Sequence, residues 1–199
     1  TAARPRSRAL AEQAAAHMMF GVPLHWMSDW GTPFALQVER AQGAELVDVD
    51  GHRLADFCLG DTGAMFGHSP AAVAEALQAQ AVKGLTTMLA GEDAVAVSAV
   101  PSERFGLPQW AFAMTATDAN RFVLRWIRTA TARPVLLVFN GCYHGTVDDV
   151  FVDLVDGLPV QRPSLLGQVH ELTATTRVVE FNDLAAREAA LAPGDVACV

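Results

Sequence analysis

Residues 110–145, WAFAMTATDANRFVLRWIRTATARPVLLVFNGCYHG, decide the fold of this chain. The stretch opens and closes on apolar runs, 110–114 and 135–139, and each run predicts a strand. Between the runs, apolar side chains recur at the helical spacing of three and four residues, at Phe122, Val123, Trp126, Ile127 and Ala130. The order strand, tight turn, helix, strand is that of a βαβ unit, so the sequence predicts an α/β fold.

The turn at residues 115–119 lies where the first predicted strand ends, which is the edge where α/β units bind ligands. Thr117 or Asp118 is expected to cap a helix that begins near Ala119. The first amides of a helix have no intrahelical partner, so they bind anions, and phosphate above all. Small residues at Thr115 and Ala116 let an anion approach the backbone, and the threonine hydroxyls add donors. The same turn also fits an ordinary capped helix without a ligand.

Tyr143 follows the second predicted strand and therefore lies at the same edge of the sheet as the turn. Its ring can cover a planar ligand whose phosphate binds the neighbouring helix. Gly141 and Gly145 permit a sharp backbone turn on both sides of the aromatic side chain. With this second feature, a ligand site is the favoured interpretation of the stretch.

Residues 140–145, Asn-Gly-Cys-Tyr-His-Gly, resemble the Gly-Cys-Tyr-His-Gly segment of the class III aminotransferases. This family of pyridoxal-phosphate (PLP) enzymes includes glutamate-1-semialdehyde aminomutase. The resemblance implies the α/β PLP-dependent transferase fold type I, with a three-layer αβα large domain and a small N-terminal β segment. It covers nearly the whole chain, from about residue 20 to the end, but only the first half of the family's length.

The resemblance also assigns roles at the site. In the family the tyrosine stacks on the pyridine ring, and a Ser-Gly-Thr-Glu-Ala turn, here Thr-Ala-Thr-Asp-Ala, holds the cofactor phosphate. It implies that Thr115, Ala116 and Thr117 hold the phosphate and that Tyr143 stacks on the ring. His144 supports the ring or orients the tyrosine, and a purely structural role for it is equally open. Ala116 replaces the family's glycine, and the substrate preference of known members is not carried over.

The resemblance divides the chain into residues 1–69 and 70–199. The first part is expected to hold a helix over 7–19, an irregular segment near the active-site mouth, a hairpin over 34–50 and a strand over 54–59. The second part is the first portion of the PLP-binding large domain. Its other expected elements are helices over 70–82, 92–105 and 183–191, strands over 177–181 and 196–199, and a surface excursion over 157–176.

Lys83 is the only lysine of the chain, and it lies upstream of the turn and of Tyr143. In the family, the lysine that forms the Schiff base with PLP lies well downstream of the Tyr-His-Gly segment. Lys83 matches no family lysine, so no catalytic residue is assigned. The chain is therefore expected to be the N-terminal half of an enzyme whose remainder lies in a longer chain or a second polypeptide.

The composition of the chain excludes some classes of binding partner. A net charge of −8 argues against nucleic acid, and the absence of an 18-residue apolar run argues against a membrane span. Three cysteines without a spacing pattern are typical of reduced thiols in a cytoplasmic protein. His68 has no metal ligand at suitable spacing, and the aspartates of 146–156 fit a solvated acidic rim better than a divalent-ion site.

The implied activity moves an amino group between an amino acid or amine and a keto acid or aldehyde, in a homodimer of the full enzyme. An aminomutase or an amino-acid racemase on the same fold is the first alternative, because those reactions differ only in substrate contacts. A non-catalytic half-enzyme that serves as a binding module is the second. The Gly-x-Gly-x-x-Gly and Walker motifs are both absent, which counts against dinucleotide and ATP sites.

Overall fold

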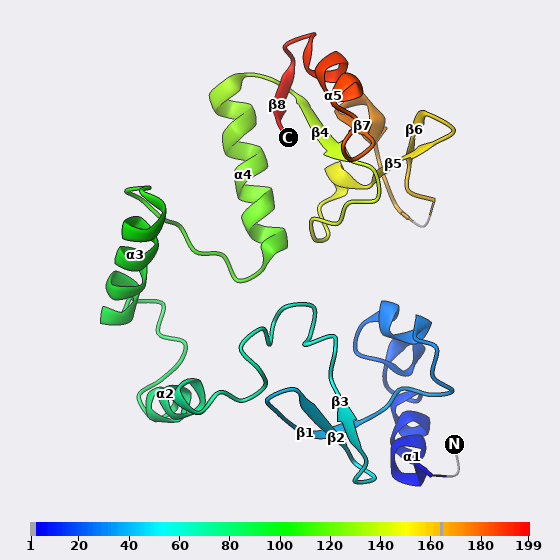
Figure 1. Ribbon diagram of the computed structural model, residues 1–199, viewed down its shortest axis with the longest axis vertical. Coiled ribbons are helices and arrows are strands. Elements are labelled where there is room, and N and C mark those ends of the chain that lie inside the picture. The colour runs from blue at the N-terminus through cyan, green and yellow to red at the C-terminus, as the bar shows by residue number, and fades with distance from the viewer. Residues whose placement is uncertain (1–2, 164) are drawn as a thin grey trace. The chain divides into compact units, whose positions relative to one another are not determined.

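The structure is a computed structural model that describes residues 3–163 and 165–199. The chain forms two compact units that meet in sequence between Ala90 and Gly91 (Figure 1). The division expected at residue 69, between a small β segment and a cofactor-binding domain, stays a prediction.

The N-terminal unit holds a three-stranded antiparallel sheet in the order β1-β2-β3. Its elements are α1 (Pro5–Ala14), η1 (Met19–Gly21), η2 (His25–Asp29), β1 (Val38–Gln42), β2 (Glu45–Asp48), β3 (Arg53–Ala55) and α2 (Ala71–Ala81). The predicted hairpin and the predicted helix over 70–82 are thus confirmed, with small differences at their ends.

Two predictions for this unit were wrong in their bounds. The first helix ends at Ala14 rather than at residue 19, because the chain reverses at Phe20 and Gly21, both with positive φ, and brings Gly21 against Ala15. The third strand ends at Ala55 rather than at residue 59, because the Asp56 carboxylate accepts hydrogen bonds from the next amides and turns the chain.

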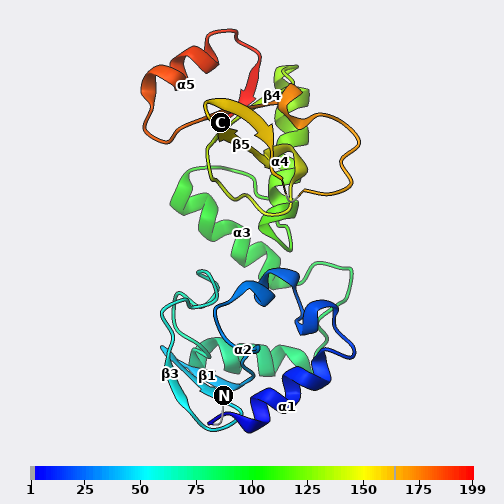
Figure 2. The ribbon, with the colours of Figure 1, turned by 90° about the vertical axis from the view of Figure 1, so that its right-hand side faces the viewer.

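Two aspartates beside the turn after β2 hold the start of α1. The Asp50 carboxylate accepts hydrogen bonds of 2.8 Å from the backbone amides of Arg6 and Ser7, two of the helix amides that lack an intrahelical partner. Asp48, which is fully buried, accepts a 2.7 Å hydrogen bond from Arg4 Nε. Figure 1 and Figure 2 both show the start of α1 beside this turn. These ionic contacts attach the helix to the sheet.

The C-terminal unit is built on a three-stranded parallel sheet in the order β7-β4-β8. Its elements are α3 (Glu92–Phe105), α4 (Ala116–Thr131), β4 (Val135–Phe139), η3 (Asp148–Val150), β5 (Val152–Val155), β6 (Leu158–Gln161), η4 (Leu172–Ala174), β7 (Thr176–Val179), α5 (Leu184–Leu191) and β8 (Val196–Cys198). The predicted strand over 135–139 is confirmed. So is the helix capped by Asp183, whose side chain accepts from the Ala186 amide.

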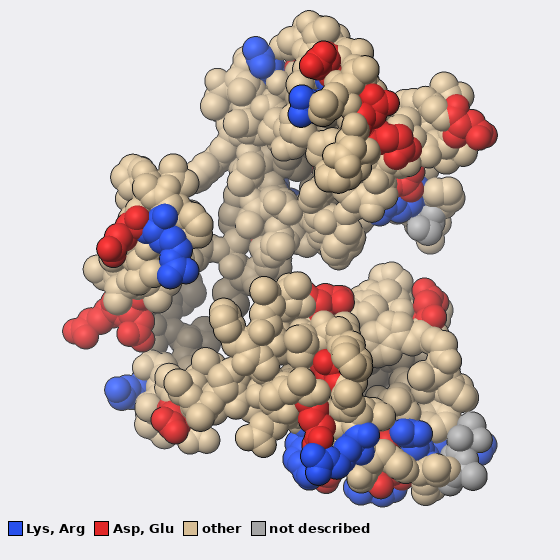
Figure 3. Space-filling view, viewed as in Figure 1, with Lys and Arg blue, Asp and Glu red and all other residues tan. Residues whose placement is uncertain are grey.

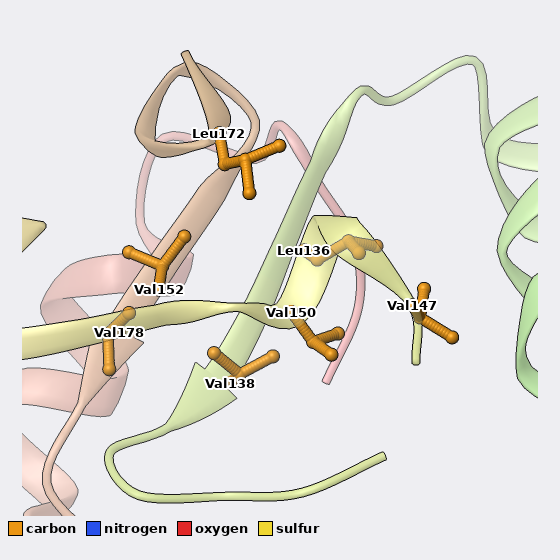
Figure 4. Packing of buried hydrophobic residues seen from close by; sticks show 7 residues of the cluster. All are labelled: Leu136, Val138, Val147, Val150, Val152, Leu172 and Val178. Carbon is orange, nitrogen blue, oxygen red and sulfur yellow. The ribbon is translucent and has the colours of Figure 1, made fainter. Parts of the chain in front are cut away.

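The central strand β4 is buried on both faces, as expected for a parallel sheet. On one face, Val135 and Leu137 pack with Val179 and Val196 under two alanines of α5. The residues on the other face pack with segments 147–152 and 172 (Figure 4); the cluster is Leu136, Val138, Val147, Val150, Val152, Leu172 and Val178. Packed side chains on both faces of the sheet therefore hold β4, the strand whose carboxyl end leads into residues 140–146, called the Tyr143 segment.

Two further predictions for the C-terminal unit were wrong. Residues 110–114 do not form a strand, because no strand of the described chain lies beside them to accept their hydrogen bonds. Residues 157–176 are more than a surface excursion, because β6 pairs with β5 and Leu172 is completely buried in the core. The burial of Leu172 depends on contacts with β4, which is distant from it in sequence.

No helix within residues 3–163 and 165–199 is long and apolar enough to cross a membrane. Figure 3 shows acidic side chains at several separate places on the C-terminal unit, with few basic side chains among them on the face in view. This distribution agrees with the overall negative charge.

Leu172→Ala is expected to lower the free energy of unfolding by about 2–5 kcal/mol, because it removes a completely buried side chain from the core cluster of the C-terminal unit. Leu166→Ala makes the same chemical change at a side chain that is 87% exposed, and should cost less than about 0.5 kcal/mol. Urea denaturation of both variants measures the difference. Equal costs would contradict the packing described here.

The stability of the N-terminal unit should fall at low pH through Asp48. Burial alone would raise the pKa of the Asp48 carboxyl, but hydrogen bonds from the His52 amide and from Arg4 outweigh it and lower that pKa to about 2, from 3.8. A carboxyl whose pKa is lower in the folded state stabilises the fold above the unfolded pKa, and this contribution is lost as the pH falls towards 2. Thermal melts between pH 5 and 2 should show the loss in the natural chain, and a shallower pH dependence in Asp48→Asn.

Candidate functional site

Helix α4 begins at Ala116 and is capped by Thr115. The Thr115 hydroxyl accepts a 3.1 Å hydrogen bond from the Asp118 amide and donates a 2.8 Å hydrogen bond to the Asp118 carboxylate. The predictions that Thr117 or Asp118 caps the helix and that it begins near Ala119 were therefore wrong. Thr115 has the extended backbone that a capping residue needs, and Asp118 three positions on completes the pair.

The first amides of α4 are free to bind an anion. The backbone amides of Ala116 and Thr117 have no acceptor among the described residues, and they lie at the positive end of the helix dipole. The Thr115 hydroxyl already donates to Asp118. The donors available at this helix start are therefore mainly backbone groups, together with the Thr117 hydroxyl proton.

The segment after β4 lies directly on the first turns of α4. Thr117 Oγ1 accepts a 3.0 Å hydrogen bond from the Thr146 amide. Asn120 Nδ2 donates a 3.0 Å hydrogen bond to the His144 carbonyl, and Arg121 donates a 2.9 Å hydrogen bond to the Thr146 carbonyl. Gly145 lies between these contacts with φ of +77°, and a Cβ there would lie 2.2 Å from Thr117 Oγ1. The structure therefore brings the turn before α4 and residues 140–146 together, although the first strand of the predicted βαβ unit does not form.

The Tyr143 side chain is 72% exposed and His144 is exposed. A hollow of about 330 Å³ adjoins the segment, lined by residues of α4, β4 and β8 together with His144. Neither Tyr143 nor Thr115 is among the described residues that line it. The structure thus places His144 at the hollow and leaves the Tyr143 ring free on the surface beside the helix start.

Three residues of this site were missed by the sequence analysis. Asn120 and Arg121 follow Thr117 at three and four positions, so the three side chains share one helix face, and that polar spacing was a usable signal. Arg162, at the end of β6, donates a 3.3 Å hydrogen bond to the Cys142 carbonyl, and nothing in its sequence context indicated this contact. Local sequence thus offered a signal for Asn120 and Arg121 but none for Arg162.

Other reactive groups of the chain take no part in the site. Burial raises the pKa of the Cys142 thiol, which disfavours the thiolate and makes this residue a packing group. Lys83 is exposed just after α2, in the N-terminal unit. No group of three or more metal-ligating side chains is found in the described part of the chain.

A parallel α/β sheet whose central strand leads into a segment hydrogen-bonded to a helix start is the arrangement of the α/β class of proteins. The profile of the family "Aminotransferase class-III" matches residues 26–189. The chain belongs to the class III aminotransferase family and has its PLP-dependent fold type I.

Named relatives agree with this assignment. A glutamate-1-semialdehyde-aminomutase from Pseudomonas aeruginosa PAO1 superposes with a TM-score of 0.92 and 48% identity, over 97% of this chain and 43% of that one. Glutamate-1-semialdehyde 2,1-aminomutase of Chloroflexus aurantiacus is 37% identical over 160 residues, which are 77% of this chain and 35% of the relative. An omega-transaminase from Sphaerobacter thermophilus superposes with a TM-score of 0.86 and 27% identity, over 96% of this chain and 46% of that one. The chain spans less than half the length of these relatives.

Gly145→Ala should push the Tyr143 segment away from α4, because the new methyl group would lie 2.2 Å from Thr117 Oγ1 at a residue with positive φ. We expect a loss of roughly 2–4 kcal/mol in the free energy of unfolding, the sum of the left-handed backbone cost and the overpacking cost. Gly157→Ala is the matched control, since Gly157 has φ of +78° but nothing within 4 Å of the added methyl. Urea denaturation should show the smaller loss for the control, and equal losses would mean that the close approach is not a constraint.

Proposed function

We propose that this chain supplies the cofactor-phosphate and ring contacts of a PLP-dependent aminotransferase. The observation that carries the proposal is the attachment of the Tyr143 segment to the start of α4 by three hydrogen bonds, in a chain whose family match spans both elements. The residues fit the cofactor. Two free backbone amides face outward at a helix start, and an exposed aromatic ring lies on the adjoining segment.

In this proposal the amides of Ala116 and Thr117 and the Thr117 hydroxyl hold the phosphate, and the helix dipole favours its negative charge. The Thr115 hydroxyl holds the helix cap and contributes indirectly, because Asp118 already binds it. Tyr143 covers one face of the pyridine ring, and His144 lines the adjoining hollow. PLP, when bound, carries the amino group between substrates and withdraws electrons from the reacting carbon.

The reaction class that we propose is transfer of an amino group from an amino acid or amine to a keto acid or aldehyde. The donor becomes a carbonyl compound and the acceptor becomes an amine, so no redox partner is consumed. The only lysine, Lys83, lies in the N-terminal unit and is assigned no part in the chemistry. We propose that the remainder of the enzyme supplies the amine that holds PLP covalently.

An aminomutase, which moves the amino group within one molecule, is the second candidate. The similarity to aminomutases at 48% and 37% identity favours it. The two reactions are separated by product analysis, because transfer consumes a second keto acid and isomerisation does not.

We also propose that the full enzyme is a cytoplasmic homodimer. The three cysteines are free thiols, which supports a reducing compartment. Several large apolar side chains between α2 and α3, including Leu85, Met88 and Leu89, are 68–97% exposed, which supports burial against another chain or segment. Sedimentation of the full enzyme tests the dimer.

Ala116→Pro should weaken PLP binding selectively. Proline at the first helical position preserves the helix and removes one free amide, and the extended Thr115 tolerates a following proline. Loss of one hydrogen bond to a charged phosphate, about 1.5–3 kcal/mol, corresponds to roughly 10- to 100-fold weaker PLP binding. Calorimetric titration with PLP and with pyridoxal, which lacks the phosphate, measures the effect, and pyridoxal binding should not change.

Leu184→Pro is the control for this experiment, because it makes the same change at the first position of α5, away from the Tyr143 segment. It should leave PLP binding unaltered. Equal binding of PLP and pyridoxal by the natural chain, or an Ala116→Pro variant that binds PLP normally, would contradict the phosphate site at α4.

A further inference from the structure

We propose that Asn120 and Arg162 are positioning residues that together fix Tyr143 beside the start of α4; this inference rests on the proposed role of Tyr143 as the ring contact for the cofactor. The two side chains come from different elements. Each binds a backbone carbonyl next to Tyr143, one on either side of it in sequence.

Tyr143 needs such support because its own groups make no contact within the described chain that would fix its position. Neither its backbone groups nor its phenol makes a hydrogen bond with any residue in the described ranges, and its side chain is 72% exposed. Its place is therefore set by the residues before and after it. A ring that must meet a ligand at a fixed distance from the helix amides needs both neighbours held, because one held end leaves the segment free to pivot.

The contact after Tyr143 comes from α4. Asn120 Nδ2 donates a 3.0 Å hydrogen bond to the His144 carbonyl. Two residues further on, Arg121 donates to the Thr146 carbonyl and Thr117 accepts from the Thr146 amide. Asn120 lies one turn after the free amides of Ala116 and Thr117, on the same rigid helix. The side chain that holds the Tyr143 segment is thus built on the element that presents the anion-binding amides.

The contact before Tyr143 comes from the end of β6. Arg162 Nη2 donates a 3.3 Å hydrogen bond to the Cys142 carbonyl. The same guanidinium also binds the Asp153 carboxylate, with hydrogen bonds of 2.8 Å from Nη2 and 3.1 Å from Nε. The Phe151 ring lies 5.2 Å from the guanidinium carbon. Planar packing and a carboxylate held at two nitrogens fix the direction in which the remaining N–H points. Arg162 therefore acts as a rigid donor rather than as a solvated charge.

The Asn120 and Arg162 contacts attach the segment around Tyr143 to two different elements of the structure. Asn120 fixes the distance between the segment around Tyr143 and helix α4. Arg162 attaches the same segment to the β5–β6 hairpin, which packs on the core through the buried Val152. Neither side chain needs to touch the cofactor. The inference therefore adds two supporting residues, 42 positions apart in the numbering, to a site whose proposed ligand contacts are Ala116, Thr117 and Tyr143.

Tyr143 is the only tyrosine of the chain, so it can be observed directly. We would replace it biosynthetically with 3-fluorotyrosine, which gives a single ¹⁹F resonance, and record that resonance before and during titration with PLP. The test variants are Asn120→Ala and Arg162→Lys, the second of which keeps the charge but loses the forked geometry. Arg125→Ala and Arg125→Lys are the controls, because Arg125 is exposed on the same helix and its side chain makes no hydrogen bond with a described residue.

The expected result is a resonance that moves towards that of free fluorotyrosine in both test variants, without PLP, and stays in place in both controls. PLP binding should weaken by about two- to tenfold in each test variant, the effect of one ordinary hydrogen bond. Thermal melts of the same samples should show folded proteins. A variant that does not fold is replaced by Asn120→Leu or Arg162→Gln.

Resonances of folded test variants that coincide with those of the natural chain, with unchanged PLP affinity, would overturn the inference. A purely structural role would lower the melting temperature without moving the ¹⁹F resonance at temperatures where the protein is folded. If PLP moves no resonance in the natural chain, the proposed function fails. The spectra without PLP still decide whether Asn120 and Arg162 hold Tyr143.

Discussion

The close approach of Gly145 to Thr117 is the constraint on which the candidate site depends. It joins the end of the central strand to the start of a helix at van der Waals contact, with no room for a side chain at residue 145. Because Gly145 is small, the amide of Thr146 reaches Thr117, and Asn120 and Arg121 reach the carbonyls on either side. A ligand site between two elements is only as well defined as the distance between them, and here the Gly145 backbone lies against Thr117 with no room for a side chain between them.

Helix α4 uses two faces for different tasks. Thr117, Arg121, Leu124 and Arg128 follow one stripe: the first two bind the segment after β4, Leu124 packs against the core, and Arg128 forms a 2.8 Å ion pair with Asp149. The stripe with Phe122 and Trp126 stays largely exposed in the described chain, at 46% and 71%. The helix is therefore attached by polar contacts near both ends, and its more apolar side is largely exposed in the described chain.

The three strands of the parallel sheet could be predicted from the sequence, because each is a short apolar run. The run Val-Leu-Leu-Val-Phe at 135–139 is buried on both faces, as its composition indicates. The cap of α4 was misplaced because Thr115, Thr117 and Asp118 are all able to cap, and only the folded backbone shows which of them is extended. The strand expected at 110–114 failed because a strand requires a neighbour, which composition does not reveal.

Of the supporting residues, Arg162 could not be predicted, for the same reason that Leu172 was taken for part of a surface excursion. Arg162 and Leu172 gain their roles only when segment 147–176 folds back over β4. The ligand contacts predicted at Thr115, Ala116, Thr117, Tyr143 and His144 remain predictions. What the structure adds is their setting: backbone amides are the free donors at the helix start, and the carbonyls of Cys142 and His144 are hydrogen-bonded on either side of an exposed Tyr143.

The position of β4 in the sheet has a consequence for how the chain acquires its fold. β4 is the first of the three parallel strands to be synthesised, yet it lies in the middle, and its partners follow roughly 40 and 60 residues later, at Thr176 and Val196. Until both arrive, five consecutive apolar residues without a charge are exposed on the growing polypeptide, which is the composition that favours self-association. Non-local pairing of this kind forms slowly, so this segment is exposed to aggregation until both partner strands have been synthesised.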